Sequence, residues 1–126
     1  MRAIEKKMNK AIRSQENFRL DNTEVKVIRN GILHDGIYVF LHNNLIAEFG
    51  NNNEIWLASG GWQSNTTKSR LNAICSEFAP NVGIFQKNWE WFVSTADKIL
   101  PWNGNTLSLF TDFNNGSMPD GTQINI

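Results

Sequence analysis

Short apolar runs separated by turn residues fill the region from residue 24 to residue 58, and they constrain the fold most. Asn30-Gly31 is a strong hairpin signal, because both residues tolerate positive φ. His42-Asn43-Asn44 and Gly50 with three following asparagines separate the later runs. Such spacings predict an antiparallel meander of three or four strands. The runs lie at residues 25–29, 36–41, 45–49 and 54–58.

A helix is predicted over residues 65–79, directly after a Gly60-Gly61 turn. Ser64 or Asn65 is the natural N-cap, because its side-chain oxygen can accept from an amide of the first turn. Pro80 cannot continue the helix and ends it after Ala79. One stripe of the helix is predicted to face the core: Thr67, Leu71, Ile74, Cys75 and Phe78.

A second helix is predicted at the N-terminus, over residues 2–16, with Ile4, Met8 and Ile12 on one side. Its other faces are basic. The favoured interpretation is a docking helix with a solvated basic side. The alternative is a basic arm that contacts phosphates or an acidic partner. That arm would consist of Lys6, Lys7, Lys10 and Arg13.

Two further strands follow Pro80, at residues 82–86 and 89–93, with a turn at Lys87-Asn88. Alternation places Trp89, Trp91 and Val93 on one face of the second strand. Residues 106–110 read as an added edge strand, which could pair between copies to form a homo-oligomer. Residues 114–126 are rich in helix and strand breakers and predict a flexible tail.

Together these elements predict an α+β fold. An antiparallel sheet of about five or six strands packs on one central helix (65–79), with the N-terminal helix beside it. Residues 1–20 form the basic amphipathic helix, residues 21–113 a single α+β domain, and residues 114–126 the tail. The length of 126 residues suits one domain.

Charge and cysteine content narrow the function classes. Formal net charge is zero, but residues 1–30 carry +4 and the remainder −4. A neutral chain argues against strong non-specific nucleic-acid binding. The single cysteine excludes an internal disulfide, and no segment resembles a signal peptide or a membrane span. These features predict a cytosolic protein without membrane partners.

The start of the helix at 65–79 is the leading candidate binding site. Free amides and the positive end of the helix dipole favour anions there, and Trp62 could stack on a base. In the competing interpretation the polar residues only cap the helix, Trp62 fills the core, and Arg70 pairs with Glu77. The candidate ligand-binding set is Trp62, Asn65, Thr66, Thr67, Lys68, Arg70 and Asn72, of which Thr66, Lys68, Arg70 and Asn72 are expected to face outward.

Catalytic and metal sites have less support. His34, beside Asp35, and His42 flank one predicted strand and would lie roughly 26 Å apart, too far to share a metal. Cys75 falls on the buried stripe and reads as a core residue rather than a nucleophile. Gly60-Gly61 lacks the ending of a phosphate-binding loop. We therefore expect no metal, no cofactor and no catalytic residues, and an enzyme is disfavoured.

The aromatic residues offer a second candidate surface. Trp56, Trp62, Trp89, Trp91 and Phe92 could form a stacking platform for single-stranded nucleic acid or a protein-binding patch. The competing interpretation places most of them in the core.

The stretch Gly60-Gly61-Trp62 to Ala73, with its Thr-Thr-Lys and Arg-Leu-Asn, resembles a family of small bacteriophage proteins of unassigned function. Residues 38–47 and the hairpin 85–92 are similar to that family as well. The resemblance implies a viral protein acting in the cytoplasm of an infected bacterium. The leading hypothesis is a non-enzymatic accessory protein that binds nucleic acid or a phosphate-bearing ligand through residues 65–72. The alternatives are a protein-binding modulator of a host enzyme or defence system, and a structural or interaction protein without a ligand.

Overall fold

A computed structural model describes residues 1–29, 35–50, 54–110 and 122–125 of the chain. A large sheet runs through the molecule in the order β1-β2-β3-β4-β5-β9-β10. All neighbours pair antiparallel except β9 and β10, which are parallel. The strands are β1 (Phe18–Leu20), β2 (Thr23–Ile28), β3 (Gly36–Leu41), β4 (Asn44–Phe49), β5 (Glu54–Leu57), β9 (Leu107–Phe110) and β10 (Thr122–Asn125).

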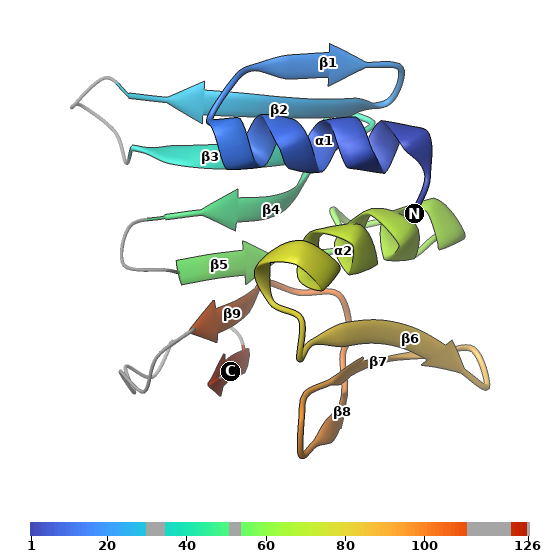
Figure 1. Cartoon of the computed structure of the whole chain (residues 1–126). Coiled ribbons are helices and arrows are strands. Elements are labelled where there is room, and N and C mark those ends of the chain that lie inside the picture. The colour runs from blue at the N-terminus through green and yellow to red at the C-terminus, as the bar shows by residue number, and fades with distance from the viewer. Residues whose placement is uncertain (30–34, 51–53, 111–121, 126) are drawn as a thin grey trace.

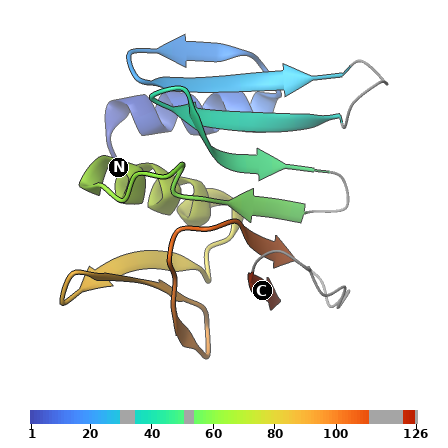
Figure 2. The same ribbon diagram turned by 180° about the vertical axis from the view of Figure 1, so that it is seen from behind.

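Both helices, α1 (Ala3–Ser14) and α2 (Asn65–Phe78), lie on the same face of this sheet (Figures 1 and 2). Ser64 is the N-cap of α2, and its side chain accepts from the amide of Thr67. The chain leaves the helix at Ala79, directly before Pro80. The predicted α+β fold, with an antiparallel sheet, a central helix and an N-terminal helix, is confirmed.

The core lies between the helices and the sheet. Alternate residues of the strands point into it, because side chains of a strand alternate between its faces. Helical spacing brings one stripe of each helix to the same layer. The fully buried side chains include Met8 of α1, Leu71 and Ile74 of α2, and Val25, Val39, Leu57, Leu107 and Leu109 of the sheet.

A second, three-stranded antiparallel sheet flanks α2, in the order β6-β7-β8. It consists of β6 (Gly83–Lys87), β7 (Glu90–Ser94) and β8 (Ile99–Pro101). Lys87 pairs with Glu90, so the turn between β6 and β7 contains only Asn88 and Trp89. This hairpin extends from the body of the molecule in Figure 1.

Some segments differ from the prediction. Residues 18–20 form the edge strand β1 and residues 99–101 form β8, and the sequence predicted no strand at either place. Residues 106–110 were predicted as an edge strand, yet β9 lies between β5 and β10. Both edges of β9 are therefore paired within the described sheet, and β9 has no free edge for pairing with a second copy.

Several predictions fall on other parts of the chain. The Asn30-Gly31 turn, His34 and residues 114–121 of the predicted tail lie outside the described residues. The strand β10 occupies residues 122–125 of that tail. In the described residues, no helix is long and apolar enough to cross a membrane.

Candidate binding surface

Arg70, predicted to face outward from α2, lies in the interior instead, with 3% of its surface exposed. Its guanidinium donates to the Glu5 carboxylate of α1 at 2.7 Å, to the Thr23 hydroxyl at 3.0 Å and to the Asn22 carboxamide oxygen at 3.2 Å. The planar fork of an arginine suits three acceptors from different segments. Arg70 therefore joins α2 to α1 and β2, and Glu77 pairs with Arg13 instead.

Glu5 is the buried counterpart of this contact. Burial alone would raise the pKa of its carboxyl group. Hydrogen bonds from the Ser69 hydroxyl, the Arg2 backbone amide and Arg70, together with the charge of Arg70, outweigh burial and hold the pKa below its ordinary value. Glu5 is thus an ionised carboxylate of the core at neutral pH.

Thr67 and Asn72 also act inside the fold. The buried Thr67 hydroxyl donates to the carbonyl of Trp62 at 2.8 Å and so holds the loop before α2. The Asn72 carboxamide accepts from the Ile84 amide and donates to the Ile84 carbonyl, both at 2.8 Å. It therefore pairs with β6 as a neighbouring strand would. Asn72, predicted to be an outward ligand-binding residue, is a structural link.

The outward part of the helix start is smaller than predicted. Asn65 is exposed, and Thr66 and Lys68 are half-buried. Lys68 donates to the Gln86 side chain at 2.8 Å, and its ammonium lies 5.8 Å from the centre of the Trp91 ring. The predicted site therefore keeps a single cation at this end of α2, and that cation is already engaged with the second sheet.

Trp62 is 70% exposed, so it does not fill the core. It forms one wall of an open groove of about 390 Å³, whose other lining residues are Leu41, His42, Asn44, Ser59 and Thr67. Gly60 and Gly61, with φ of 70° and 82°, make the turn that brings Trp62 to the surface.

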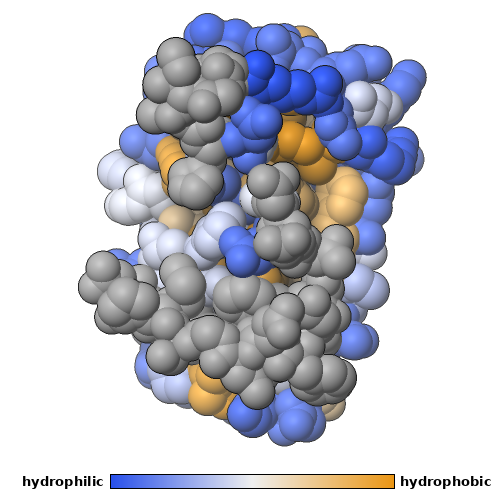
Figure 3. Space-filling view, turned by 90° about the vertical axis from the view of Figure 1, so that its left-hand side faces the viewer, coloured by the Kyte–Doolittle hydropathy of each residue, from blue (hydrophilic) through white to orange (hydrophobic). Residues whose placement is uncertain are grey.

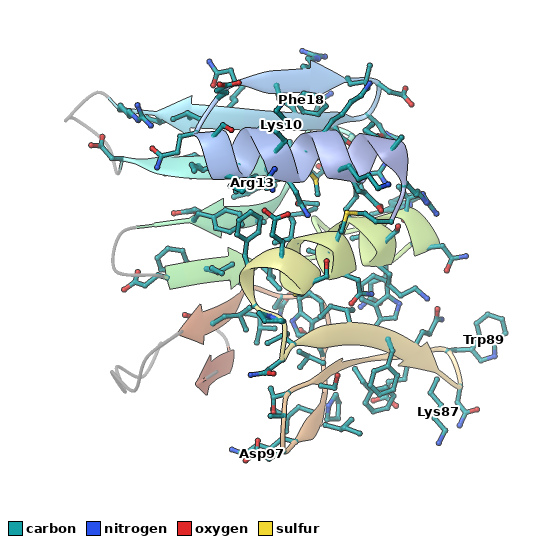
Figure 4. All side chains as sticks on the ribbon, in the orientation of Figure 1. Lys10, Arg13, Phe18, Lys87, Trp89 and Asp97 are labelled. Atoms are coloured by element: carbon teal, nitrogen blue, oxygen red, sulfur yellow. The ribbon has the colours of Figure 1, made fainter. Side chains whose placement is uncertain are left out.

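Trp89 is the most exposed large hydrophobic residue of the described chain, at 94%. Alternation predicted that Trp89 shares the face of Trp91. This prediction is wrong, because Trp89 belongs to the turn and not to β7. Asn88 and Trp89 have φ of 53° and 67°, which makes a type I′ turn. The second position of this turn favours glycine, and a bulky residue there is an outlier. Figure 4 shows Trp89 at the tip of the hairpin, pointing away from the body.

A cleft of about 460 Å³ lies beside this turn. Beneath it, the Trp91 and Trp102 rings pack with their centres 6.1 Å apart. Consecutive residues of the loop before α2, Trp62 and Gln63, line the groove and the cleft respectively, so the two hollows flank one loop. We call the two exposed rings, Trp62 and Trp89, together with the groove and the cleft, the tryptophan surface. The cleft is lined by Gln63, Trp89, Glu90, Trp91, Pro101, Trp102 and Asn103.

The side of the molecule away from the β6–β7 turn has a different character. Figure 3 views it directly: hydrophilic residues dominate its upper part, and apolar surface shows only in small, separate areas. Among the aromatic side chains that the structure describes, Trp62 and Trp89 are the exposed ones, at 70% and 94%.

The predicted basic arm is exposed on α1. Lys6, Lys7, Lys10 and Arg13 all face solvent. Arg13 pairs with Glu77 of α2, whereas the three lysines form no ion pair with another described residue. Figure 4 shows Lys10 and Arg13 on α1, on a different part of the molecule from Trp89.

The remaining candidates for catalysis or metal binding are Cys75 and His42. Cys75 is buried, and burial raises the pKa of its thiol to about 12. His42, the first residue of the β3–β4 turn, has positive φ and is exposed. Within the described ranges, no three histidine, cysteine or acidic residues lie close enough together to hold a metal ion.

The fold and this surface define a small α+β protein with solvent-facing tryptophans on the turns around its central helix. The chain belongs to the Kyanoviridae Gp96 protein family, a family of phage proteins, whose sequence profile matches residues 1–118. The match includes the N-terminal helix, which the resemblance seen in the sequence left out. No curated protein and no solved structure matches the chain.

Proposed function

We propose that this phage protein binds a protein partner through the tryptophan surface, as a modulator of a host enzyme or defence system in the infected cell's cytoplasm. The observation that carries the proposal is Trp89, an almost fully exposed indole in a turn position that favours glycine. Such a residue costs stability and solubility in the free protein, so a bound state that uses it explains its presence.

Tryptophan suits this role on energetic grounds. Tryptophans are enriched among the few interface residues that supply most of the binding free energy. Burial of Trp62 and Trp89 against a partner would remove a large apolar area from water. The free energy gained is roughly 25 cal/mol for each Å² of apolar surface buried. The polar residues around the cleft, Gln63 and Asn103, would form the hydrated rim that surrounds such anchors.

Charge supports a protein partner over a nucleic acid at this surface. Nucleic-acid affinity depends on several cations that neutralise phosphates. Lys68 is engaged with Gln86, Arg70 is buried, and Glu90 adds a negative charge to the cleft. Among the described residues, no lysine or arginine lines the cleft.

An affinity capture from lysate of infected host cells tests the proposal. The wild-type chain should retain a stoichiometric protein, and the variants Trp89→Gly and Trp62→Ser should lose it. Lys98→Ala, a change at another exposed site, serves as the matched control and should capture as the wild type does. Capture that is equal with all four chains would overturn the assignment to this surface.

Nucleic-acid binding is the second candidate, and the lysines of α1 favour it. Lys6, Lys7 and Lys10 are exposed within two turns of one helix and lack ion-pair partners among the described residues. Here α1 would contact phosphates, with Asn65, Thr66 and Lys68 of α2 as neighbouring polar contacts.

Salt dependence separates this candidate from the first. Binding to a single- or double-stranded oligonucleotide should weaken steeply with salt, and the triple variant Lys6→Ala/Lys7→Ala/Lys10→Ala should reduce the salt slope by about two to three. Absence of binding to DNA and RNA at low salt would exclude it. Arg13→Ala is the control, because that side chain is paired with Glu77.

A further inference from the structure

We infer that the groove beside Trp62 binds the adenine base of a nucleoside. The inference goes beyond the proposed function, because it gives the groove a small-molecule ligand and does not depend on a protein partner. Three properties of the groove lead to this ligand. Its aromatic wall is held on a fixed backbone, several of its polar groups have no partner, and its described lining carries no charged lysine, arginine, aspartate or glutamate.

The first property is the rigidity of the aromatic wall. The Trp62 amide donates to the Ser59 carbonyl at 3.2 Å, and the Trp62 carbonyl accepts from the Thr67 hydroxyl at 2.8 Å. A Cβ atom at Gly60 would lie 2.9 Å from the Cβ of Asn44, so the turn before Trp62 packs directly against the start of β4. A backbone that is fixed before the ligand arrives loses little entropy on binding. The 70%-exposed indole is therefore a preformed stacking face.

The second property is unused hydrogen-bonding capacity. Ser59 is 5% exposed, and its hydroxyl accepts from the Gly61 amide at 3.2 Å but has no acceptor for its own proton among the described residues. The carboxamide of Asn44 and the ring of His42 form no hydrogen bond with another described residue. A buried hydroxyl without an acceptor costs free energy, which a ligand acceptor would recover. The groove therefore presents both donors and acceptors to a ligand.

The third property is the absence of fixed charge. Within the described part of the chain, no lysine, arginine, aspartate or glutamate lines the groove. Phosphates and carboxylates bind most strongly to cationic side chains, so this lining suits an uncharged ligand. The volume of the groove is about 390 Å³, and small-molecule sites occupy about 300–1,000 Å³.

Adenine matches all three properties. Aromatic side chains stack on the flat face of a base. An asparagine carboxamide pairs with adenine through two hydrogen bonds, one accepted from the N6 amino group and one donated to N7. In this groove Trp62 would stack on the base, Asn44 would pair with its edge, and the Ser59 hydroxyl would donate to a ring nitrogen.

Nitrogen-15 NMR of the full chain, with adenosine as the probe, tests this inference, because its five tryptophans each give an indole N–H signal. We expect a saturable shift of the Trp62 signal and no shift of the Trp89 signal, since Trp89 lies outside the groove. Asn44→Leu should weaken adenosine binding by about five- to hundred-fold. Asn44→Asp keeps the shape of the side chain and removes its donor, so it should show a comparable loss.

The matched control is Asn65→Ala, at another exposed asparagine that lies outside the groove. It should bind adenosine as the wild type does. Equal losses for Asn65→Ala and Asn44→Leu would place the site at the start of α2 and overturn the assignment to the groove. AMP should bind no more tightly than adenosine. A gain of about ten-fold or more from the phosphate would overturn the assignment of an uncharged ligand.

Two further results decide against a base in this groove. They are the absence of a Trp62 shift with adenosine at up to about 10 mM, and a Trp62 shift that maltohexaose produces and adenosine does not. Either result, combined with Trp89-dependent capture of a host protein, would reject this inference and leave the proposed function standing. Saturable adenosine binding without such capture would reject the host-modulator proposal and support the nucleoside groove.

Discussion

The Arg70 guanidinium and the Glu5 carboxylate lie 2.7 Å apart, and both side chains are almost fully buried, at 4% and 2% exposure. The contact joins residues 65 positions apart in the sequence, from the two helices. Ser69 also donates to Glu5, and Thr23 and Asn22 accept from Arg70. Arg70, one of the residues that make the start of α2 resemble a binding motif, thus holds the two helices and β2 together.

Removal of one partner of this pair should destabilise the protein strongly. Arg70→Met leaves the Glu5 charge buried without its cation, and we expect a loss of about 3–5 kcal/mol in the free energy of unfolding. The double variant Glu5→Leu/Arg70→Met should recover much of that loss. Urea unfolding followed by circular dichroism measures both.

The exposed Arg13–Glu77 pair is the matched control. Its side chains are 56% and 30% exposed, so Arg13→Ala should cost less than about 1 kcal/mol. A similar cost for Arg13→Ala and Arg70→Met would contradict the central role of the buried pair.

Stability should fall in acid because of Glu5. The pKa of its carboxyl group lies below the ordinary value of 4.5 in the folded state. The stabilisation is therefore complete above pH 4.5 and is lost as the pH falls through the folded pKa. Unfolding measured from neutral pH downward should show a steeper decline for the wild type than for Glu5→Gln. Parallel curves would argue against Glu5 as a group that governs acid stability.

Asn72 should hold β6 at the side of α2. In Asn72→Ala, the Ile84 amide and carbonyl both lose their partner, at a cost of about 1–3 kcal/mol for each group that stays buried. Hydrogen exchange at the Ile84 amide should accelerate more than exchange at Val39, in the centre of the large sheet. Ser76→Ala on the same helix is the control, since its hydroxyl donates only within α2.

Replacement of Trp89 by glycine should stabilise the protein. An L-residue in the left-handed region costs about 1–2 kcal/mol relative to glycine, part of which the entropy of glycine in the unfolded chain offsets. We expect Trp89→Gly to exceed Trp89→Ala in unfolding free energy by about 1 kcal/mol, because alanine keeps the strain at positive φ. Equal stability of the two variants would mean that the turn does not strain residue 89.

Cys75 should not react with a thiol reagent in the folded protein at neutral pH. Its thiol is 1% exposed and has a pKa of about 12, and only the thiolate is nucleophilic. The reaction should become complete when the chain is unfolded in urea. Rapid labelling of the native protein would place Cys75 in a different environment from the one described.

The sequence alone determined the parts of the fold that depend on local spacing. Apolar alternation between turn residues located β2 to β5, and helical periodicity bounded by Ser64 and Pro80 located α2. These signals are local, because strand alternation, helix capping and the missing N–H of proline act within a few residues. The short strands β1 and β8 carry too few residues for such a pattern.

Only the tertiary structure decided which polar and aromatic residues face solvent. Arg70 lies on α2 at a position that periodicity could not distinguish from a solvent-facing one, and its burial depends on Glu5, which α1 supplies from far away in the sequence. The β6–β7 turn lies one residue later than predicted, so Trp89 belongs to the turn and not to β7. Side chains alternate between two faces only within a strand, and Trp89 therefore lies at the exposed tip instead of on the face of Trp91. The burial of Arg70 and the position of the β6–β7 turn are therefore the reasons why the candidate site is the tryptophan surface and not the start of α2.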